Sequence, residues 1–134
     1  MGAGAIPVDI EAAFRQRQLK STGLSMYTAP FEYTGDDRID VSFGSGNFVF
    51  APPRALLFDL RLGRLSQEQF QNDYAAFLRN SFGLHMHNWD RLLESGTIVL
   101  VCSCNEKAKH CHRFVLIEFL KQFGAVYRGE IGVR

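Results

Sequence analysis

The chain has 134 residues, a net charge of +1 and 46% hydrophobic residues. This length fits one ordinary domain, which can bury a core without disulfides to hold it together. Non-specific nucleic-acid binding is not expected, because neutralising phosphates requires a basic excess that this chain lacks. The balanced charge does not exclude a small anionic ligand held by two or three cationic side chains.

The N-terminal residues 1–22 have neither the early basic region nor the long apolar core of a secretory signal. No stretch of the chain approaches the roughly 20 apolar residues that cross a bilayer. We therefore expect a cytoplasmic protein without a membrane segment. Residues 8–18 could form a short helix, but its apolar face is thin. Residues 1–22 are predicted as an N-terminal extension, with an integrated helix as the alternative, and residues 23–134 as one α/β domain.

Alternating and helical patterns predict the elements of the first two thirds. Strands are expected at residues 24–33 and 38–43, followed by a hairpin turn at 44–47 and a short apolar return at 48–50. Helices are expected at 55–62, 67–81 and 86–94. Ser66 and Gln69 have the spacing of a capping box, which should begin the second of these helices.

The C-terminal third has the clearest pattern. The β-branched apolar run at residues 97–101 predicts a strand buried on both faces, as in a parallel sheet. An apolar helix should follow from Cys111 and end at Gly124, before a last strand at 125–127. Together these patterns predict an α/β fold, a small three-layer Rossmann-like domain with a mostly parallel sheet and a C-terminal βαβ unit.

A dense group of reactive side chains lies between that strand and helix, in VCSCNEKAKHCHR at residues 101–113. In an α/β sheet, ligands bind beyond the carboxyl ends of the strands, where loops meet helix N-termini. The helix start, Lys107, Lys109 and Arg113 should together favour an anion or a cysteine thiolate. Cys111 at the helix start is the candidate nucleophile or redox thiol, and His112 the candidate general base or acid.

The cysteines could instead bind a metal or serve only in packing. Zinc is the metal that this donor set would bind, although the spacing is not that of a common zinc finger. The proposed ligands are Cys102, Cys104, Cys111 and His112, with His110 or His87 as substitutes. Alternatively, a cysteine can be a plain buried hydrophobe, and Cys102 fits this role best because it prolongs an apolar strand.

An acidic residue upstream is a further candidate. Asp40 lies between Ile39 and Val41 in a half-buried strand, where it could orient a catalytic partner. Asp36 and Asp37 are better explained by turn chemistry.

The strand that ends in Cys102, the polar loop and the Cys111-His112-Arg113 helix start resemble the bacterial and phage proteins grouped as domain of unknown function 488. Residues 26–53 (MYTAPFEYTGDDRIDVSFGSGNFVFAPP) resemble the start of the family's short phage and prophage branch. The resemblance covers residues 25–130. The resemblance implies that the family's characteristic residues are Cys102, Cys111, His112 and Arg113. It also implies that Asp40 falls at a characteristic acidic position and that Cys104 is a feature of the phage branch. The family has no settled activity.

Three hypotheses follow. The first is a small enzyme acting on a nucleotide or another phosphate-bearing small molecule, in which Arg113, Lys107 and Lys109 bind the anion and Cys111, His112 and Asp40 perform the chemistry. The second is a zinc module without catalysis that binds a protein. The third is a phage protein that binds a host protein and makes no demand on the cysteines.

Overall fold

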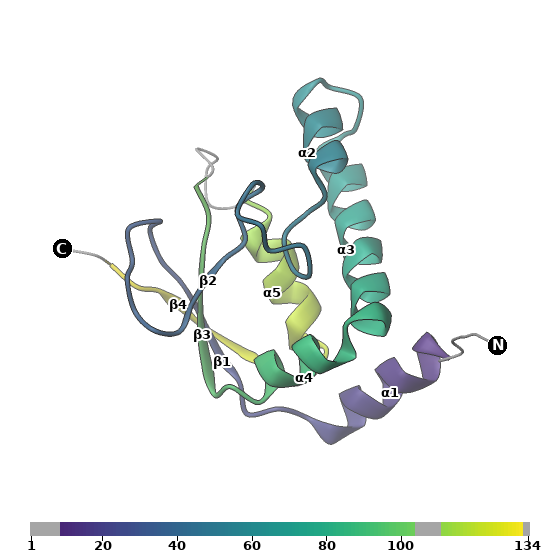
Figure 1. Ribbon diagram of the computed structural model, residues 1–134, viewed down its shortest axis with the longest axis vertical. Coiled ribbons are helices and arrows are strands. Elements are labelled where there is room, and N and C mark those ends of the chain that lie inside the picture. The colour runs from purple at the N-terminus through teal and green to yellow at the C-terminus, as the bar shows by residue number, and fades with distance from the viewer. Residues whose placement is uncertain (1–8, 104–110, 133–134) are drawn as a thin grey trace.

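The computed structural model describes residues 9–103 and 111–132. Five helices and four strands occur there in the chain order α1 (Ile10–Lys20), β1 (Ser25–Thr28), β2 (Arg38–Asp40), α2 (Arg54–Arg61), α3 (Gln67–Leu84), α4 (Met86–Leu93), β3 (Thr97–Val101), α5 (Arg113–Lys121) and β4 (Val126–Glu130) (Figure 1). The capping box is confirmed, because the Ser66 hydroxyl accepts from the Gln69 amide and the Gln69 side chain accepts from the Ser66 amide.

The four strands form one parallel sheet in the order β2-β3-β1-β4. The first strand of the chain is therefore central, between β3 and β4. Strand β4 follows the last helix, as predicted, and β3 has the predicted bounds. The expected α/β class with a parallel sheet is confirmed.

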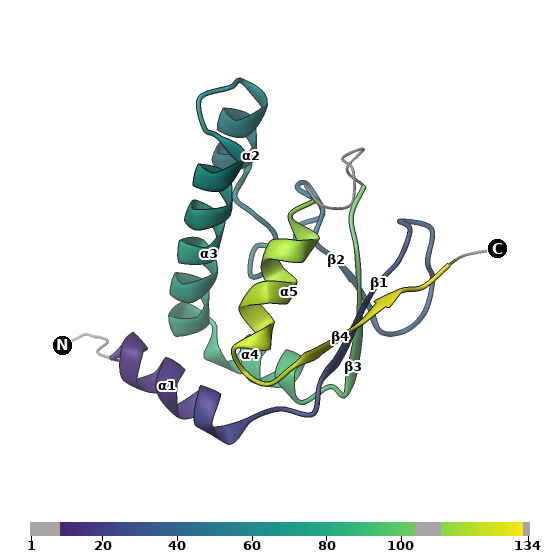
Figure 2. The same cartoon turned by 180° about the vertical axis from the view of Figure 1, so that it is seen from behind.

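The helices lie on one side of this sheet (Figures 1 and 2). They pack on the face that carries Met26, Ile98 and Leu100, all of which are buried. The centre of this core is aromatic. The Trp89 ring lies with its centroid 4.8 to 6.4 Å from those of four phenylalanines: Phe50, Phe82, Phe119 and Phe123.

The opposite face of the sheet differs from the expected three-layer arrangement. Val99 and Val101 on this face pack with Tyr33 from the connection between β1 and β2 and with Ile131. Within residues 9–103 and 111–132, no helix covers this face. The connection at residues 29–37 crosses β3 to reach β2, and it is too short to include a helix as well.

The predicted hairpin at residues 44–50 is wrong. Residues 48–50 form a turn, and their carbonyl groups bond to side chains of α3 instead of to a neighbouring strand. The Ser81 hydroxyl donates to Val49 at 2.7 Å, and the Tyr74 hydroxyl donates to Phe50. Val49 and Phe50 are buried while Phe48 is exposed, so this short apolar run resembles a strand in sequence without pairing as one.

The first helix packs into the aromatic core through Phe14, while Arg17 on the same helix is buried and donates to Glu94. Phe14 is 1% exposed, and its ring contacts those of Phe82, Phe119 and Phe123. The helix α1 is thus packed against the domain, which was the alternative to a separate N-terminal extension. Among the described residues, no helix is both long and apolar enough to span a membrane.

Replacing Phe14 with alanine should lower the free energy of unfolding by about 3–5 kcal/mol, because it leaves a cavity in the aromatic core. Leu19→Ala on the same helix is the matched control, since Leu19 is 86% exposed and its loss should cost less than about 0.5 kcal/mol. Urea unfolding measures both. Equal effects of the two substitutions would show that α1 does not contribute to the core.

Candidate functional site at the ends of three parallel strands

The site lies at the carboxyl edge of the sheet, where β1 and β3 end side by side. Thr28 is level with Leu100, and Asp40 of β2 is level with Val101 on the other side of β3. From β1 the chain moves toward β2, whereas from β3 it moves toward β4. Such a reversal of direction between adjacent parallel strands opens the crevice in which α/β proteins bind ligands.

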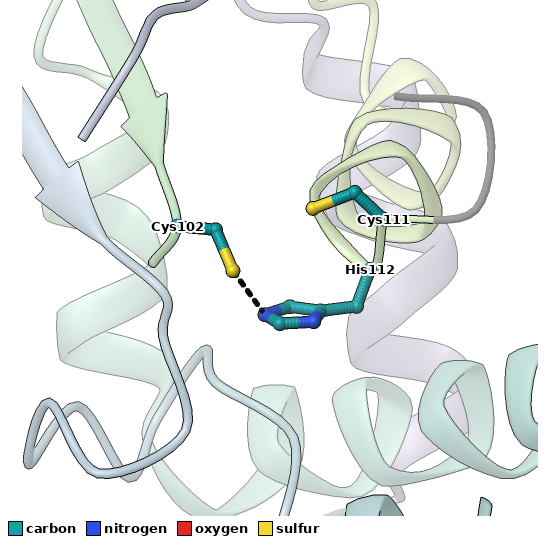
Figure 3. Close-up of side chains that lie close together, drawn as sticks. All are labelled: Cys102, Cys111 and His112. Carbon is teal, nitrogen blue, oxygen red and sulfur yellow. Dashed lines mark hydrogen bonds between the residues drawn. The ribbon is translucent and has the colours of Figure 1, made fainter. Parts of the chain in front are cut away.

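Cys102, Cys111 and His112 converge in this crevice. One ligand atom from each of them lies within 4.8 Å of the other two. Cys102 follows β3 while Cys111 and His112 begin α5, and their side chains point toward one another (Figure 3). They are 7%, 2% and 4% exposed. The structure therefore brings together three of the four residues predicted as metal ligands or redox groups.

The ring of His112 is held by two contacts of one nitrogen. Its Nε2 lies 2.6 Å from the carbonyl oxygen of Val41 and 3.4 Å from Sγ of Cys102. A carbonyl oxygen can only accept, so Nε2 carries the proton and donates it to Val41. In the neutral ring, Nδ1 is then the atom that can accept a proton.

Burial is the main cause that lowers the pKa of His112 below its ordinary value of 6.5. Negative charge on Cys111 and the bond to Val41 act in the opposite direction, and the cations Arg113 and Arg61 add to the lowering. The imidazole is therefore neutral at pH 7, which suits proton transfer.

Arg113 lies directly beside the Cys111 sulfur. Its Nε donates to Cys111 Sγ at 3.2 Å and its NH1 donates to the Ala29 carbonyl at 3.0 Å. The residue is 9% exposed, so its charge acts in a largely desolvated place. A guanidinium that donates to sulfur there favours the thiolate over the thiol. In this structure the positive charge of Arg113 therefore lies next to the Cys111 sulfur.

The carboxylate of Asp40 points into its own loop. Its Oδ1 accepts from the Ser42 amide at 2.9 Å, and the Ser42 hydroxyl accepts from the Ser103 amide at 2.7 Å. Asp40 is not a member of the Cys102–Cys111–His112 group. In the described part of the chain it shapes the loop that meets the end of β3. Its catalytic role stays a prediction.

Two residues near the site were not predicted from the sequence. The Tyr74 ring stands edge-on to His112, with centroids 6.0 Å apart, and burial raises the pKa of its hydroxyl well above 10. Arg61 at the end of α2 contributes to the lowered pKa of His112. Helical spacing identified Tyr74 only as an apolar position of α3. No local pattern connects Arg61 with a site some fifty residues later in the chain.

Several predicted residues are not part of this geometry. His87, a substitute ligand, lies on α4 and is outside the group. The remaining candidates lie outside the described residues: Cys104, Lys107, Lys109 and His110.

Comparison with known proteins gives one match, to a family model described as the active DUF488-N3 subclade, over residues 16–124. The chain belongs to the DUF488 family. The match includes Asp40 and the whole Cys102-to-Arg113 segment, so the resemblance seen in the sequence is confirmed. Membership of the phage and prophage branch stays a prediction. No curated protein and no solved structure matches the DUF488 chain.

The lowered pKa of His112 should make stability depend on pH. Below pH 6.5 the unfolded chain takes up a proton on this histidine before the folded chain does, so stability should fall as the pH drops from 6.5 toward the lower pKa of the folded state. One such group changes the free energy of unfolding by at most about 1.4 kcal/mol per pH unit. Urea unfolding of wild type and His112→Gln at pH 7.5, 6.5 and 5.5 measures this. Equal slopes for the two proteins would contradict the assignment.

Proposed function

We propose that this protein binds a phosphate-bearing small molecule, such as a nucleotide, and acts on it through the thiolate of Cys111. The hydrogen bond from Arg113 Nε to Cys111 Sγ carries the proposal. A structural cysteine needs no such partner, because a thiol packs as a small hydrophobe. The match to a family model described as active agrees with a chemically competent site.

The thiolate would have two sources of stabilisation. One is the guanidinium of Arg113, which is close and poorly hydrated. The other is the N-terminus of α5, where unpaired amides and the helix dipole favour negative charge. Cysteines in such electropositive places are the reactive ones, and those in apolar surroundings are inert.

A ligand can reach the sulfur through a groove between α3 and α5. Cys111 forms part of the wall of a pocket of about 360 Å³. The remaining walls combine apolar and polar side chains, from Gln71, Ala75, Phe114, Val115, Glu118, Phe119 and Gln122. Such a mixed lining suits a flat ring with hydrogen-bonding edges, as in a nucleotide base.

The chemical step is nucleophilic. The Cys111 thiolate forms a bond to an electrophilic phosphorus or carbon atom of the ligand. The bond to the leaving group breaks, and that group departs with both electrons and takes a proton from solvent. Water then attacks the intermediate, its proton passes to Nδ1 of His112 and on to solvent, and the thiolate is restored. The neutral ring and the proton on Nε2 support this role of Nδ1.

Alkylation by iodoacetamide at pH 7 tests the activated thiol. Modification should be selective for Cys111 and absent in Cys111→Ser. Trypsin cleavage after Lys107 and Lys109 puts Cys111 on its own peptide, so mass spectrometry can assign the site. Labelling spread evenly over the three cysteines would refute the proposal.

Arg113→Gln should slow the alkylation of Cys111 by about 10- to 100-fold, because hydrogen bonds to charged groups contribute about 1.5–3 kcal/mol. Arg128→Gln on β4 removes the same charge from an exposed position and is the matched control, with no effect expected on the rate. The far-ultraviolet circular dichroism of both variants verifies the fold. An unchanged alkylation rate in folded Arg113→Gln would show that Arg113 does not activate the Cys111 thiol.

Zinc binding without catalysis is the second candidate, and the closeness of Cys102, Cys111 and His112 supports it. Zinc would have to bind His112 through Nδ1 or displace the Nε2–H bond to Val41, and a fourth ligand would have to come from outside the described residues. We expect this bond to persist, so purified protein should be folded without stoichiometric zinc. Elemental analysis that finds one zinc per chain would favour the metal module instead.

A further inference from the structure

Two arginines of α2 share one aromatic ring. The guanidinium carbons of Arg54 and Arg61 lie 5.2 and 5.4 Å from the centroid of the Phe43 ring. Seven residues separate the arginines in sequence, so they stand on the same face of the helix, at its beginning and its end. Phe43 comes from the loop that follows β2. This loop and α2 therefore bring two positive charges together.

The charges of this pair are not balanced within the described structure. No carboxylate in residues 9–103 or 111–132 forms an ion pair with Arg54 or Arg61, and both side chains are exposed. Arg64, just beyond the same helix, differs in this respect because its NH1 lies 3.4 Å from Asp59 Oδ1. Two cations directed at one ring repel each other, and a bound anion would relieve that repulsion.

This pair is also connected to His112 through the loop that carries Phe43. Arg61 is close enough to His112 to help to lower the pKa of its imidazole. Two residues before Phe43, the carbonyl of Val41 accepts from the His112 ring. Arg54 also lines a pocket of about 330 Å³, together with the Gly44–Phe48 loop and Phe77.

We propose that Arg54 and Arg61, held on Phe43, form the binding site for the phosphate groups of the ligand, on the side of the site where Val41 bonds to His112. This inference rests on the proposed function and specifies its substrate class. Two separate guanidinium groups suit a pyrophosphate or a nucleoside diphosphate, which offers one phosphate to each, better than a monophosphate. Neither arginine belongs to the Cys-His-Arg segment.

Phe43 would make this site effective before any ligand arrives. A guanidinium binds phosphate through two parallel hydrogen bonds, but a free arginine side chain must first be ordered. Contact with an aromatic face stabilises the position of an exposed guanidinium. The ring thus orients both arginines in advance and lowers the entropic cost of binding.

Titration calorimetry with inorganic pyrophosphate tests the proposal on wild type, Arg54→Gln, Arg61→Gln and the double variant. Each single substitution should weaken binding by about 10- to 100-fold, and the double variant should show no saturable binding. Arg64→Gln is the control, because it removes the same charge from an arginine already paired with Asp59, and its affinity should stay within twofold of wild type.

The inference would be overturned by wild type that does not bind pyrophosphate, or by a double variant that binds it as wild type does. Neither depends on the thiol. Pyrophosphate binding without selective alkylation of Cys111 would support the arginine site and refute the thiol chemistry. Selective alkylation of Cys111 without pyrophosphate binding would support the thiol chemistry and refute the arginine site. An equal loss of affinity in Arg64→Gln would show a general charge effect and refute the assignment.

Discussion

The first turn of α5 is bonded to the ends of three adjacent parallel strands, and the site depends on this attachment. Arg113 donates to Ala29 after β1, and His112 donates to Val41 after β2. His112 also contacts Cys102 after β3. One helix start therefore satisfies backbone carbonyls that would otherwise be buried without partners where the strands diverge, a loss of about 1–3 kcal/mol each. The reactive sulfurs take their positions from the same bonds.

This attachment explains how polar groups are tolerated so deep in the domain. A buried guanidinium is costly unless hydrogen bonds replace its hydration, and Arg113 has both a carbonyl and a sulfur as acceptors. The neighbouring imidazole avoids the same cost by staying neutral. A cation and a neutral base thus lie side by side, and each contacts the sulfur of a buried cysteine.

The sequence was most informative where neighbouring residues decide the outcome. The β-branched run at residues 97–101 predicted β3 with its observed bounds, and Ser66 with Gln69 marked the start of α3. Cysteine and histidine beside a helix start also indicated where Cys102, Cys111 and His112 come together. Residues 48–50 misled because a turn in which Val49 and Phe50 are buried against α3 gives the same short apolar run as a strand. The two arginines on Phe43 and the position of Tyr74 beside His112 arise from contacts between distant segments, which no local pattern contains.

The strand order has a consequence for how this chain folds. The central strand β1 is synthesised before both of its neighbours, β3 and β4, which come some seventy and one hundred residues later. Pairings so distant in sequence make folding slow, because a long loop must close before any contact stabilises it. During synthesis β1 therefore remains without either of its neighbouring strands until β3 follows. Such a nascent chain is open to aggregation until α5 and β4 have left the ribosome.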